Sequence, residues 1–346
     1  MQITRVGVDI AKNVFHVHAT DRHGKKIWQA KLSRNKWVAA LIERVPQGCQ
    51  VGMEACGSAH HWARELQKYG FDARLIAAQF VKPYVKSNKN DKVDAAAIAE
   101  AMSRPDMRFV TPKTCAQQDM QSLHRIRSER VRQRTAKANQ IRGLVNEYGI
   151  VAPLGISSLR SAIPVWLEDA DNGLSFQFRE LLDQLREELA NLDELIERCD
   201  VRVKRLVEQD PVVSRLTALR GVGPLTASAL AIALGDGSAF KNGREFAASL
   251  GLVPRQYSTG GRDSLFGISK RGDAYLRTLL VHGARAVQRF TANKEDELSH
   301  WVNELSKRKH RNIVSCALAN KTARAAWALV HHQQDYNPSL IAARAN

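Results

Sequence analysis

The sequence has no hydrophobic run approaching the roughly 18 to 20 residues that are needed to span a membrane. Its first residues, Met-Gln-Ile-Thr-Arg-Val, also lack the apolar segment of a secretory signal peptide. Cysteine is scarce: there are five, far apart, with no Cys-x-x-Cys pair. This scatter is typical of reduced packing residues and argues against a disulfide framework or a zinc site. We therefore expect a cytoplasmic protein with no membrane partner.

Acidic residues are outnumbered by basic ones. The 346 residues include 52 Lys and Arg against 35 Asp and Glu, which gives a formal net charge of +17. This excess favours a polyanionic partner such as nucleic acid. At the same time 44% of the residues are apolar, which is enough to bury real cores and excludes a disordered basic tail as the whole protein. The length favours two or three domains.

Short β-rich and helical segments alternate through the first part of the chain. Strands are predicted at residues 3–10, 14–19, 50–54 and 71–76, and helices at 35–45, 58–69 and 91–102. The first two strands are predicted to pair antiparallel. Strands and helices in this order indicate an α/β domain over residues 1–112.

Residues 113–209 are predicted to form a helical arm. A heptad stripe of apolar residues runs from Phe178 to Leu206 and requires a helical partner. That partner can be the preceding basic helix in an antiparallel coiled coil, a second chain, or the helix's own domain. The basic helix, 123–142, has the single acid Glu129 and is either a nucleic-acid contact or a solvated face. Its candidate contacts are Arg125, Arg127, Arg130, Arg134, Lys137 and Arg142.

Residues 210–346 are predicted to be a mainly helical C-terminal domain. Gly221 and Gly223 lie between two helical segments, as in a helix-hairpin-helix-like unit. The amides at the start of the second helix can hold a phosphate group. A plain turn between helices explains the two glycines equally well.

Four carboxylates are candidates for a metal site. Asp9 and Glu54 end predicted strands, where an α/β sheet binds its ligands. Asp91 and Asp94 are three residues apart, so on a helix they share one side. Four converging carboxylates need cations, and two Mg²⁺ ions would neutralise them and activate a nucleophile for phosphodiester chemistry. Taken singly, each acid is more typical of the surface or of a helix N-cap.

A second candidate site surrounds Ser258 and Thr259, which precede Gly260 and Gly261 in a segment that is a flexible turn by composition. A hydroxyl here could attack phosphorus, with nearby cations holding the scissile phosphate. No His–Asp relay is evident, so activation would have to come from a metal or from those cations. The alternative is an ordinary surface loop. The candidate phosphate-binding cations are Arg255, Arg262, Lys270, Arg271 and Arg277.

Five motifs together carry a specific resemblance over essentially the full length. They are G-V-D-I-A-K at 7–12, G-M-E-A-C-G at 52–57, N-D-K-V-D-A at 90–95, N-Q-I-R-G-L at 139–144, and S-T-G-G followed by G-I-S-K-R-G-D and L-R within 251–277. In these motifs the sequence resembles the DEDD transposases of insertion sequences, the RNA-guided bridge recombinases. The order of its acids is also similar to the RNase H-like fold of RuvC-like Holliday-junction resolvases.

The resemblance implies a RuvC-like domain joined through a coiled coil to a helical transposase domain. It implies that the four acids bind Mg²⁺ and that a serine forms a covalent 5′-phosphoserine link to DNA. Many relatives have that serine directly before the glycine, where this chain has Thr259. We favour Ser258 because the branched threonine is a sterically poorer nucleophile, and Thr259 is the competitor.

The resemblance also implies the partners: donor and target DNA, a non-coding guide RNA, and further copies of the chain in dimers and tetramers. In such assemblies the acidic domain of one protomer meets the serine domain of another. We expect a prokaryotic protein associated with the nucleoid. Two other functions fit the residues, a RuvC-like Holliday-junction nuclease that uses metal-activated water, and a non-catalytic nucleic-acid scaffold.

Overall fold

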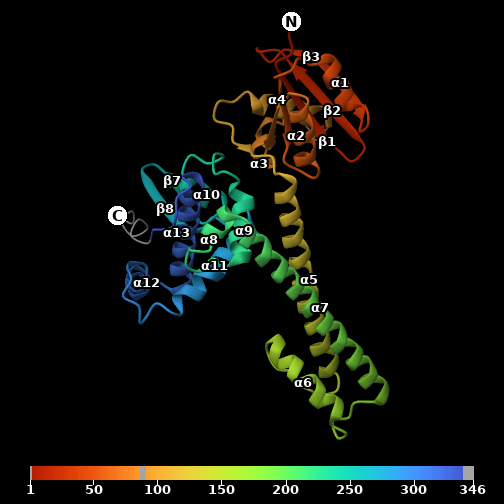
Figure 1. Ribbon diagram of the computed structural model, residues 1–346, viewed down its shortest axis with the longest axis vertical. Helices are drawn as coiled ribbons and strands as arrows, with labels where there is room; N and C mark the ends of the chain where they lie inside the picture. Colours follow the sequence, from red (N-terminus) through yellow and green to blue (C-terminus); the bar gives the residue numbers. More distant parts are fainter. Residues whose placement is uncertain (1, 86–90, 338–346) are drawn as a thin grey trace. The chain divides into compact units, whose positions relative to one another are not determined.

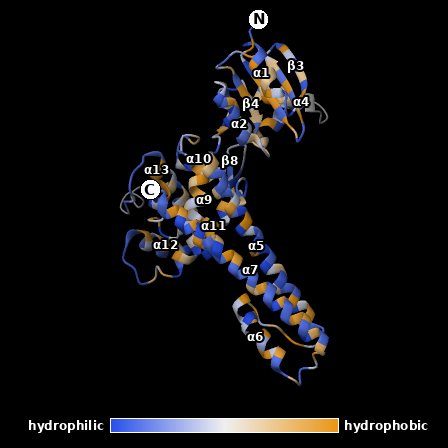
Figure 2. Ribbon diagram, turned by 45° about the vertical axis from the view of Figure 1, so that its right-hand side comes forward, coloured by the Kyte–Doolittle hydropathy of each residue, from blue (hydrophilic) through white to orange (hydrophobic). Residues whose placement is uncertain are grey.

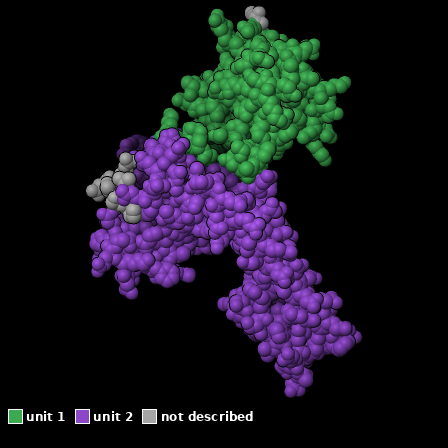
Figure 3. Space-filling model, viewed as in Figure 1, with its two compact units in different colours: residues 1–118, 235–241 green, residues 119–234, 242–346 purple. Residues whose placement is uncertain are grey.

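The structure, a computed structural model, describes residues 2–85 and 91–337, and for Asp91 and Lys92 the backbone alone. It divides into two units, coloured separately in Figure 3. The first comprises residues 1–118 and 235–241, and the second comprises residues 119–234 and 242–346. Most of the predicted arm and of the predicted C-terminal domain therefore lies in one unit. No helix in the described part of the chain is long and apolar enough to cross a membrane.

The first unit is built on a six-stranded mixed sheet (Figure 1). Its strands, in spatial order, are β3 (Lys26–Ser33), β2 (Val14–Thr20), β1 (Arg5–Ile10), β4 (Gln50–Glu54), β5 (Asp72–Ile76) and β6 (Phe109–Val110). The three central strands β1, β4 and β5 are parallel, and the other three are antiparallel to their neighbours. This mixed α/β arrangement is compatible with an RNase H-like domain.

Helices cover both faces of this sheet. On one face, Phe15 of β2 stacks on Trp37 at 4.9 Å between ring centroids and meets Trp62 edge-on at 5.4 Å. These two tryptophans belong to α1 (Trp37–Arg44) and α2 (Ala59–Lys68). The opposite face is covered by α4 (Asp91–Met102), which follows α3 (Ala78–Val81) and a 3₁₀ turn (Lys82–Tyr84). β3 lies outside the strands that the sequence predicts, because this edge strand has a largely exposed, Lys-containing pattern.

The second unit contains the heptad helix and its partner. α5 (Cys115–Asn146) and α7 (Phe176–Gln209) run antiparallel, with α6 (Ile156–Glu168) packed against them at one end (Figure 1). The helical partner of the heptad stripe thus belongs to the same chain. Figure 2 shows mainly hydrophilic residues along both helices, interrupted by hydrophobic ones. Near its end the buried stripe shifts by one position, so that Val207 is buried and the predicted Leu206 is 36% exposed.

The rest of the second unit is helical apart from one hairpin. Its elements are α8 (Pro211–Leu216), α9 (Pro224–Leu234), α10 (Gly243–Ser249), β7 (Pro254–Thr259), β8 (Arg262–Ile268), α11 (Ala274–Gln288), α12 (Glu297–Arg308) and α13 (Arg311–His331). The segment predicted as a flexible turn is thus the tip of a regular hairpin. Gly260 and Gly261 both have positive φ angles, 54° and 79°, which is the conformation that a tight two-residue hairpin turn requires.

A buried histidine ties three helices of this unit together. His124 on α5 lies 2.8 Å from the Tyr275 hydroxyl on α11 and 2.9 Å from the Ser228 hydroxyl on α9. Ser228 donates its own proton to the Pro224 carbonyl oxygen at 2.9 Å, so it accepts from His124 Nε2. The other ring nitrogen, Nδ1, then accepts a hydrogen bond from the Tyr275 hydroxyl. This arrangement holds the imidazole neutral, and burial lowers the pKa of His124 to about 4.

The lowered pKa of His124 predicts an acid-labile unit. The pKa of His124 is about 6.5 in the unfolded chain and about 4 in the folded chain, so between these two values the unfolded chain binds a proton and the folded chain does not. This difference lowers the free energy of unfolding by about 2 kcal/mol at pH 5. Above pH 6.5 this contribution disappears. Thermal unfolding of wild type and of His124→Gln between pH 5 and 7.5 measures it. The stability gap between the two proteins is expected to narrow as the pH falls, and a constant gap would contradict the assignment.

Candidate active site

Two carboxylates and one histidine lie on three adjacent strands of the first sheet. β1 and β4 pair in parallel register through Val8 and Met53, and the next residues along are Asp9 and Glu54. Neighbouring strands are about 4.8 Å apart, so these two carboxylates leave adjacent strand ends on the same face. Across the antiparallel pairing with β2, Asp9 stands opposite His16. The sequence analysis did not single out His16, although the short turn between β1 and β2 could have placed it.

The same face carries α4, whose backbone lies very close to the sheet at Gly7. A methyl group at Gly7 would lie 2.2 Å from the Ala95 carbonyl oxygen, so the helix backbone nearly touches β1. Gly7 is two residues before Asp9 and therefore shares its face. Asp94, directly before Ala95, is half-buried on α4. The helix thus begins beside the sheet face that bears Asp9 and Glu54.

We expect Gly7→Ala to destabilise the first unit by about 2 to 3 kcal/mol or more, since α4 must move away from the sheet. Gly52→Ala is the matched comparison on the neighbouring strand. Its new methyl group would approach the sulfur of Met102 at 2.2 Å, and a flexible methionine side chain can turn aside where a backbone cannot. Urea unfolding of both variants measures the difference, and equal losses would contradict this account of the helix contact.

The charges of Asp9 and Glu54 act on the same neighbour. Desolvation raises the pKa of the Cys56 thiol, and Glu54 and then Asp9 raise it further. Two carboxylates at adjacent strand ends offer the oxygen donors that a hard divalent cation prefers. Across the described part of the chain, however, no three His, Cys, Asp or Glu side chains lie close enough to hold a metal ion. Asp94 is therefore not gathered with Asp9 and Glu54, and the Asp91 side chain lies outside the described residues.

The predicted serine lies on the exposed hairpin of the second unit, opposite a carboxylate. Ser258 on β7 pairs with Asp263 on β8, and its Oγ donates a hydrogen bond to Asp263 Oδ1 at 2.5 Å. Gln256 donates to both, to Ser258 Oγ at 2.7 Å and to Asp263 Oδ1 at 3.3 Å. The sequence analysis missed Asp263 and Gln256. Recognising 254–268 as a hairpin with a Gly-Gly turn would have paired Ser258 with Asp263.

Thr259 differs from Ser258 in its surroundings. Side chains alternate along a strand, so Thr259 points to the other face of the hairpin, where its cross-strand partner is Arg262. No carboxylate partner of Thr259 is present in the described part of the chain. The two competing hydroxyls are therefore chemically unequal, since Ser258 has a proton acceptor in contact and Thr259 has a cation beside it.

The other predicted phosphate-binding cations surround the hairpin and its base. Arg255 lies over the Phe266 ring at 5.0 Å, and Arg262, Lys270 and Arg271 are exposed. Arg277 instead donates to the Leu250 carbonyl oxygen at 2.8 Å, which fixes it to the base of the hairpin. Whether these residues bind phosphate stays a prediction.

The glycines of the predicted helix-hairpin-helix unit have a packing role. Gly221 has a φ of 82°, and a methyl group there would lie 2.7 Å from the Gly283 carbonyl oxygen on α11. The turn before α9 thus packs backbone to backbone on α11, which requires glycine. Gly223 is exposed, with open space where a side chain would be. Phosphate binding by either glycine stays a prediction.

Most of the predicted basic contacts on α5 have partners in the arm itself. Arg127 pairs with Asp200 at 2.5 Å, Arg134 with Asp193 at 3.0 Å, and Lys137 with Glu188 at 2.5 Å, all across to α7. Arg130 donates to the Leu195 carbonyl oxygen and Arg142 to that of Gly155. Arg125 is exposed. These contacts explain much of the basic run by packing of the arm, and contact with nucleic acid stays a prediction.

Comparisons with known proteins cover both units. Residues 6–150 match a DEDD domain of the IS110 type described as "Transposase", and residues 213–299 match the "Transposase IS116/IS110/IS902 family". The chain is 48% identical to a "Probable family 20 transposase" of Pseudomonas aeruginosa, over 98% of this chain and 100% of that one. It is 43% identical to the "Transposase for insertion sequence element IS1328" of Yersinia enterocolitica, over 94% of this chain and 96% of that one. It is 44% identical to the "Transposase for insertion sequence element IS1111A" of Coxiella burnetii, over 96% and 90%.

The sheet with its paired acids and these full-length matches define a transposase, an enzyme that cleaves and recombines DNA. The chain belongs to the IS110/IS116 family of transposases. The family resemblance expected from the sequence motifs is confirmed at this level.

Proposed function

We propose that this transposase cleaves and exchanges DNA strands through a covalent 5′-phosphoserine intermediate on Ser258, guided by a non-coding RNA. The observation that carries the serine mechanism is the 2.5 Å hydrogen bond from Ser258 Oγ to Asp263. Guidance by RNA is proposed from the resemblance of the sequence motifs to the bridge recombinases. A nucleophilic hydroxyl needs a group that takes its proton, and Asp263 is in position to do so. Among the described residues Thr259 has no such group, which supports Ser258 as the nucleophile.

In the proposed step Ser258 Oγ attacks a backbone phosphorus while its proton passes to Asp263. The new Oγ–P bond replaces the bond from phosphorus to the 3′ oxygen, which leaves as a 3′-hydroxyl after taking up a proton. Gln256 holds the serine oxygen and the carboxylate together, and the cations Arg255 and Arg262 would stabilise charge on the phosphate. Attack by a 3′-hydroxyl of another strand then restores the serine and joins the strands.

We propose that Asp9 and Glu54 bind a divalent ion and that Asp91 and Asp94 on α4 join them only when the ion binds, because among the described residues Asp94 does not lie with the other two. Membership of a DEDD family suggests divalent metal use, and we propose Mg²⁺ because all four ligands would be oxygens. When bound, such an ion stabilises negative charge at the reacting phosphate. We further propose that the first unit, which is RuvC-like and RNase H-like, brings its acidic residues to the serine of another protomer. The protomers would form a dimer or tetramer associated with the nucleoid.

The proposal is tested by trapping the intermediate. Purified protein is incubated with Mg²⁺ and labelled DNA that carries the ends of an element, and the products are separated under denaturing conditions. A labelled adduct that survives denaturation and is removed by protease is the expected result. Cleaved DNA without any adduct would instead favour a RuvC-like nuclease that uses water. DNA binding without cleavage would favour a non-catalytic scaffold.

RNA guidance requires a separate measurement. The protein is purified from cells that carry its element, and the nucleic acid that copurifies is sequenced. We expect one discrete non-coding RNA encoded beside the transposase, with segments complementary to donor and target DNA. Recovery of only heterogeneous cellular RNA would contradict guidance, while the serine chemistry would be unaffected.

A further inference from the structure

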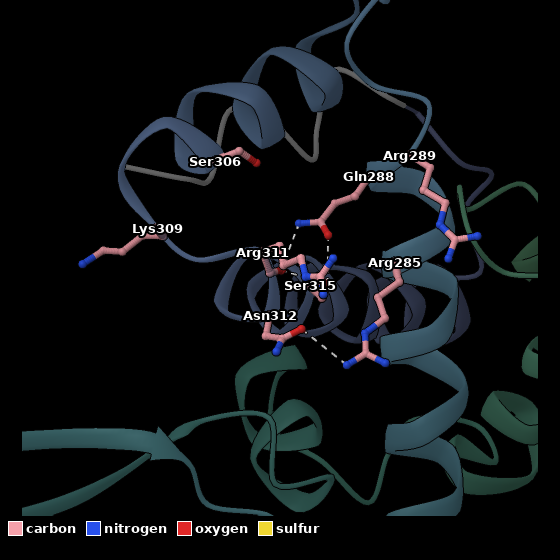
Figure 4. A pocket seen from close by; sticks show the side chains of 8 residues that line it. All are labelled: Arg285, Gln288, Arg289, Ser306, Lys309, Arg311, Asn312 and Ser315. Atoms are coloured by element: carbon pink, nitrogen blue, oxygen red, sulfur yellow. Dashed lines mark hydrogen bonds between the residues drawn. The ribbon is translucent and has the colours of Figure 1, made fainter.

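The C-terminal helices of the second unit enclose a pocket whose charge has one sign. The cavity, of about 570 Å³, is bounded by α11, by the end of α12 and by the start of α13. Arg285 and Arg289 contribute from α11, and Lys309 and Arg311 from the α12–α13 connection. Figure 4 shows Arg285 and Arg311 near Gln288 and Ser315, while Arg289 and Lys309 extend away from them. Among the described residues no carboxylate lines this cationic pocket.

Among the described residues these four cations have no acidic partner, unlike several arginines on α5, and Arg285 donates only a long hydrogen bond to Asn312 Oδ1 at 3.5 Å. The groove between α5 and α7, of about 670 Å³, is also lined by arginines, but acids line it as well, and Arg127 and Arg134 are paired with Asp200 and Asp193. In the described part of the chain none of the four pocket cations forms an ion pair. Arg285 and Arg311 carry like charges at one cavity and repel each other, and an anionic ligand would relieve this repulsion.

The pocket is held in shape by hydrogen bonds between its walls. Ser315 on α13, which is 1% exposed, donates to Gln288 Oε1 on α11 at 2.9 Å. Gln288 donates from its side-chain nitrogen to the Arg311 carbonyl oxygen at 3.3 Å. These contacts fix the first turn of α13 against α11. The cations are therefore carried on packed helices and a short connection between them, so that little ordering is needed when a ligand binds.

We propose that this cationic pocket binds the phosphodiester backbone of nucleic acid. The cavity is far larger than one phosphate group needs and matches the size of sites for larger ligands. Its cations come from α11 and from the connection between α12 and α13, and such a spread of positive charge suits an extended polyanion. Phe290, next to Arg289, is 68% exposed, and an exposed aromatic ring beside cations can stack on an unpaired base. The proposal relies on nucleic acid as the partner and not on the serine mechanism, so it is tested by binding alone.

The test compares two double variants of the full-length chain. Arg285→Gln/Arg311→Gln removes two pocket charges, and Lys307→Gln/Arg308→Gln removes two charges from the last turn of α12, outside the pocket lining. Binding of fluorescent duplex DNA, single-stranded DNA and RNA is measured by anisotropy over a range of NaCl concentrations. Circular dichroism verifies that both variants are folded.

The pocket variant is expected to bind at least about tenfold more weakly at 100 mM NaCl and to lose about 1.4 to 1.8 from the slope of log affinity against log salt concentration. The control variant is expected to lose less than a third of that. A loss confined to one of the three probes identifies the nucleic acid that occupies the pocket. An unchanged slope with all three, or equal losses in the two variants, would overturn the proposal.

If the pocket variant fails to fold, chemical footprinting of the wild-type protein tests whether nucleic acid binds the pocket. Phenylglyoxal modifies exposed arginines, and mass spectrometry measures the extent at each site. Bound nucleic acid is expected to protect Arg285 and Arg311 and to leave Arg186, which pairs with Asp183 on α7, unprotected. Equal modification of the pocket arginines with and without nucleic acid would contradict the assignment.

Discussion

Replacing Ser258 with alanine is expected to abolish the covalent protein–DNA adduct and to slow strand cleavage about a thousandfold or more, the usual effect of removing a nucleophile. Thr259→Ala is expected to retain the adduct, because Thr259 faces the side of the hairpin that holds Arg262. Both variants keep the hairpin, since both side chains are exposed. Denaturing electrophoresis of the labelled adduct measures the outcome. An adduct lost in Thr259→Ala and kept in Ser258→Ala would reverse the assignment.

Asp263→Asn separates the proton acceptor from the hydrogen-bond partner. Asparagine has the same shape and can still hold Ser258, but it cannot take up a proton at neutral pH. Removal of a general base typically slows a reaction by a factor of about 10² to 10⁴. We expect adduct formation to slow by that order and to recover as the pH is raised. A rate equal to that of wild type would mean that Asp263 only orients the serine.

The second large effect is expected at the paired acids of the first unit. Asp9→Asn removes one charge from a pair of carboxylates on adjacent strand ends, and we expect divalent-ion-dependent cleavage to fall about a thousandfold or more. Binding of DNA is expected to persist, because the basic surface is unchanged. Cleavage assays over a range of Mg²⁺ concentrations, together with anisotropy, measure the two quantities.

A matched control lies in the same sheet. Asp72 begins β5 at the opposite end of the sheet from Glu54, and it pairs with Arg74 at 2.7 Å. Asp72→Asn is expected to leave cleavage unchanged. Should the two variants lose activity equally, the effect would come from destabilising the sheet and not from a metal site.

The alternating elements of the first unit could be predicted from the sequence because local patterns decide them. Strands ending at Asp9 and Glu54 were expected from their β-branched runs, and α4 matches its predicted range of 91–102. β3 could not be predicted in the same way, since an edge strand exposes half of its residues and shows little hydrophobic contrast. The sequence therefore predicts the mixed α/β class but not the number of strands.

The candidate site was predictable only in its residue types. Asp9 beside Glu54 follows from parallel strands, whose ends meet at one edge of a sheet. Asp263 escaped prediction because its role depends on hairpin register, and the same residues read as a flexible turn when pairing is unknown. In the basic helix, charge alone could not show that acids on α7 would pair with Arg127 and Arg134, since those acids are distant in sequence.

The exposure of the hairpin has a consequence for the free protein. From Pro254 to Gly267 all residues are exposed, so none of the described residues shields the serine from solvent. In water this hydroxyl competes with solvent molecules for the phosphorus, and the Asp263 carboxylate alone makes it only modestly reactive. If Ser258 is the nucleophile that we propose, a free copy of the enzyme is therefore expected to attack DNA only slowly, until an assembly on DNA shields this hydroxyl from solvent.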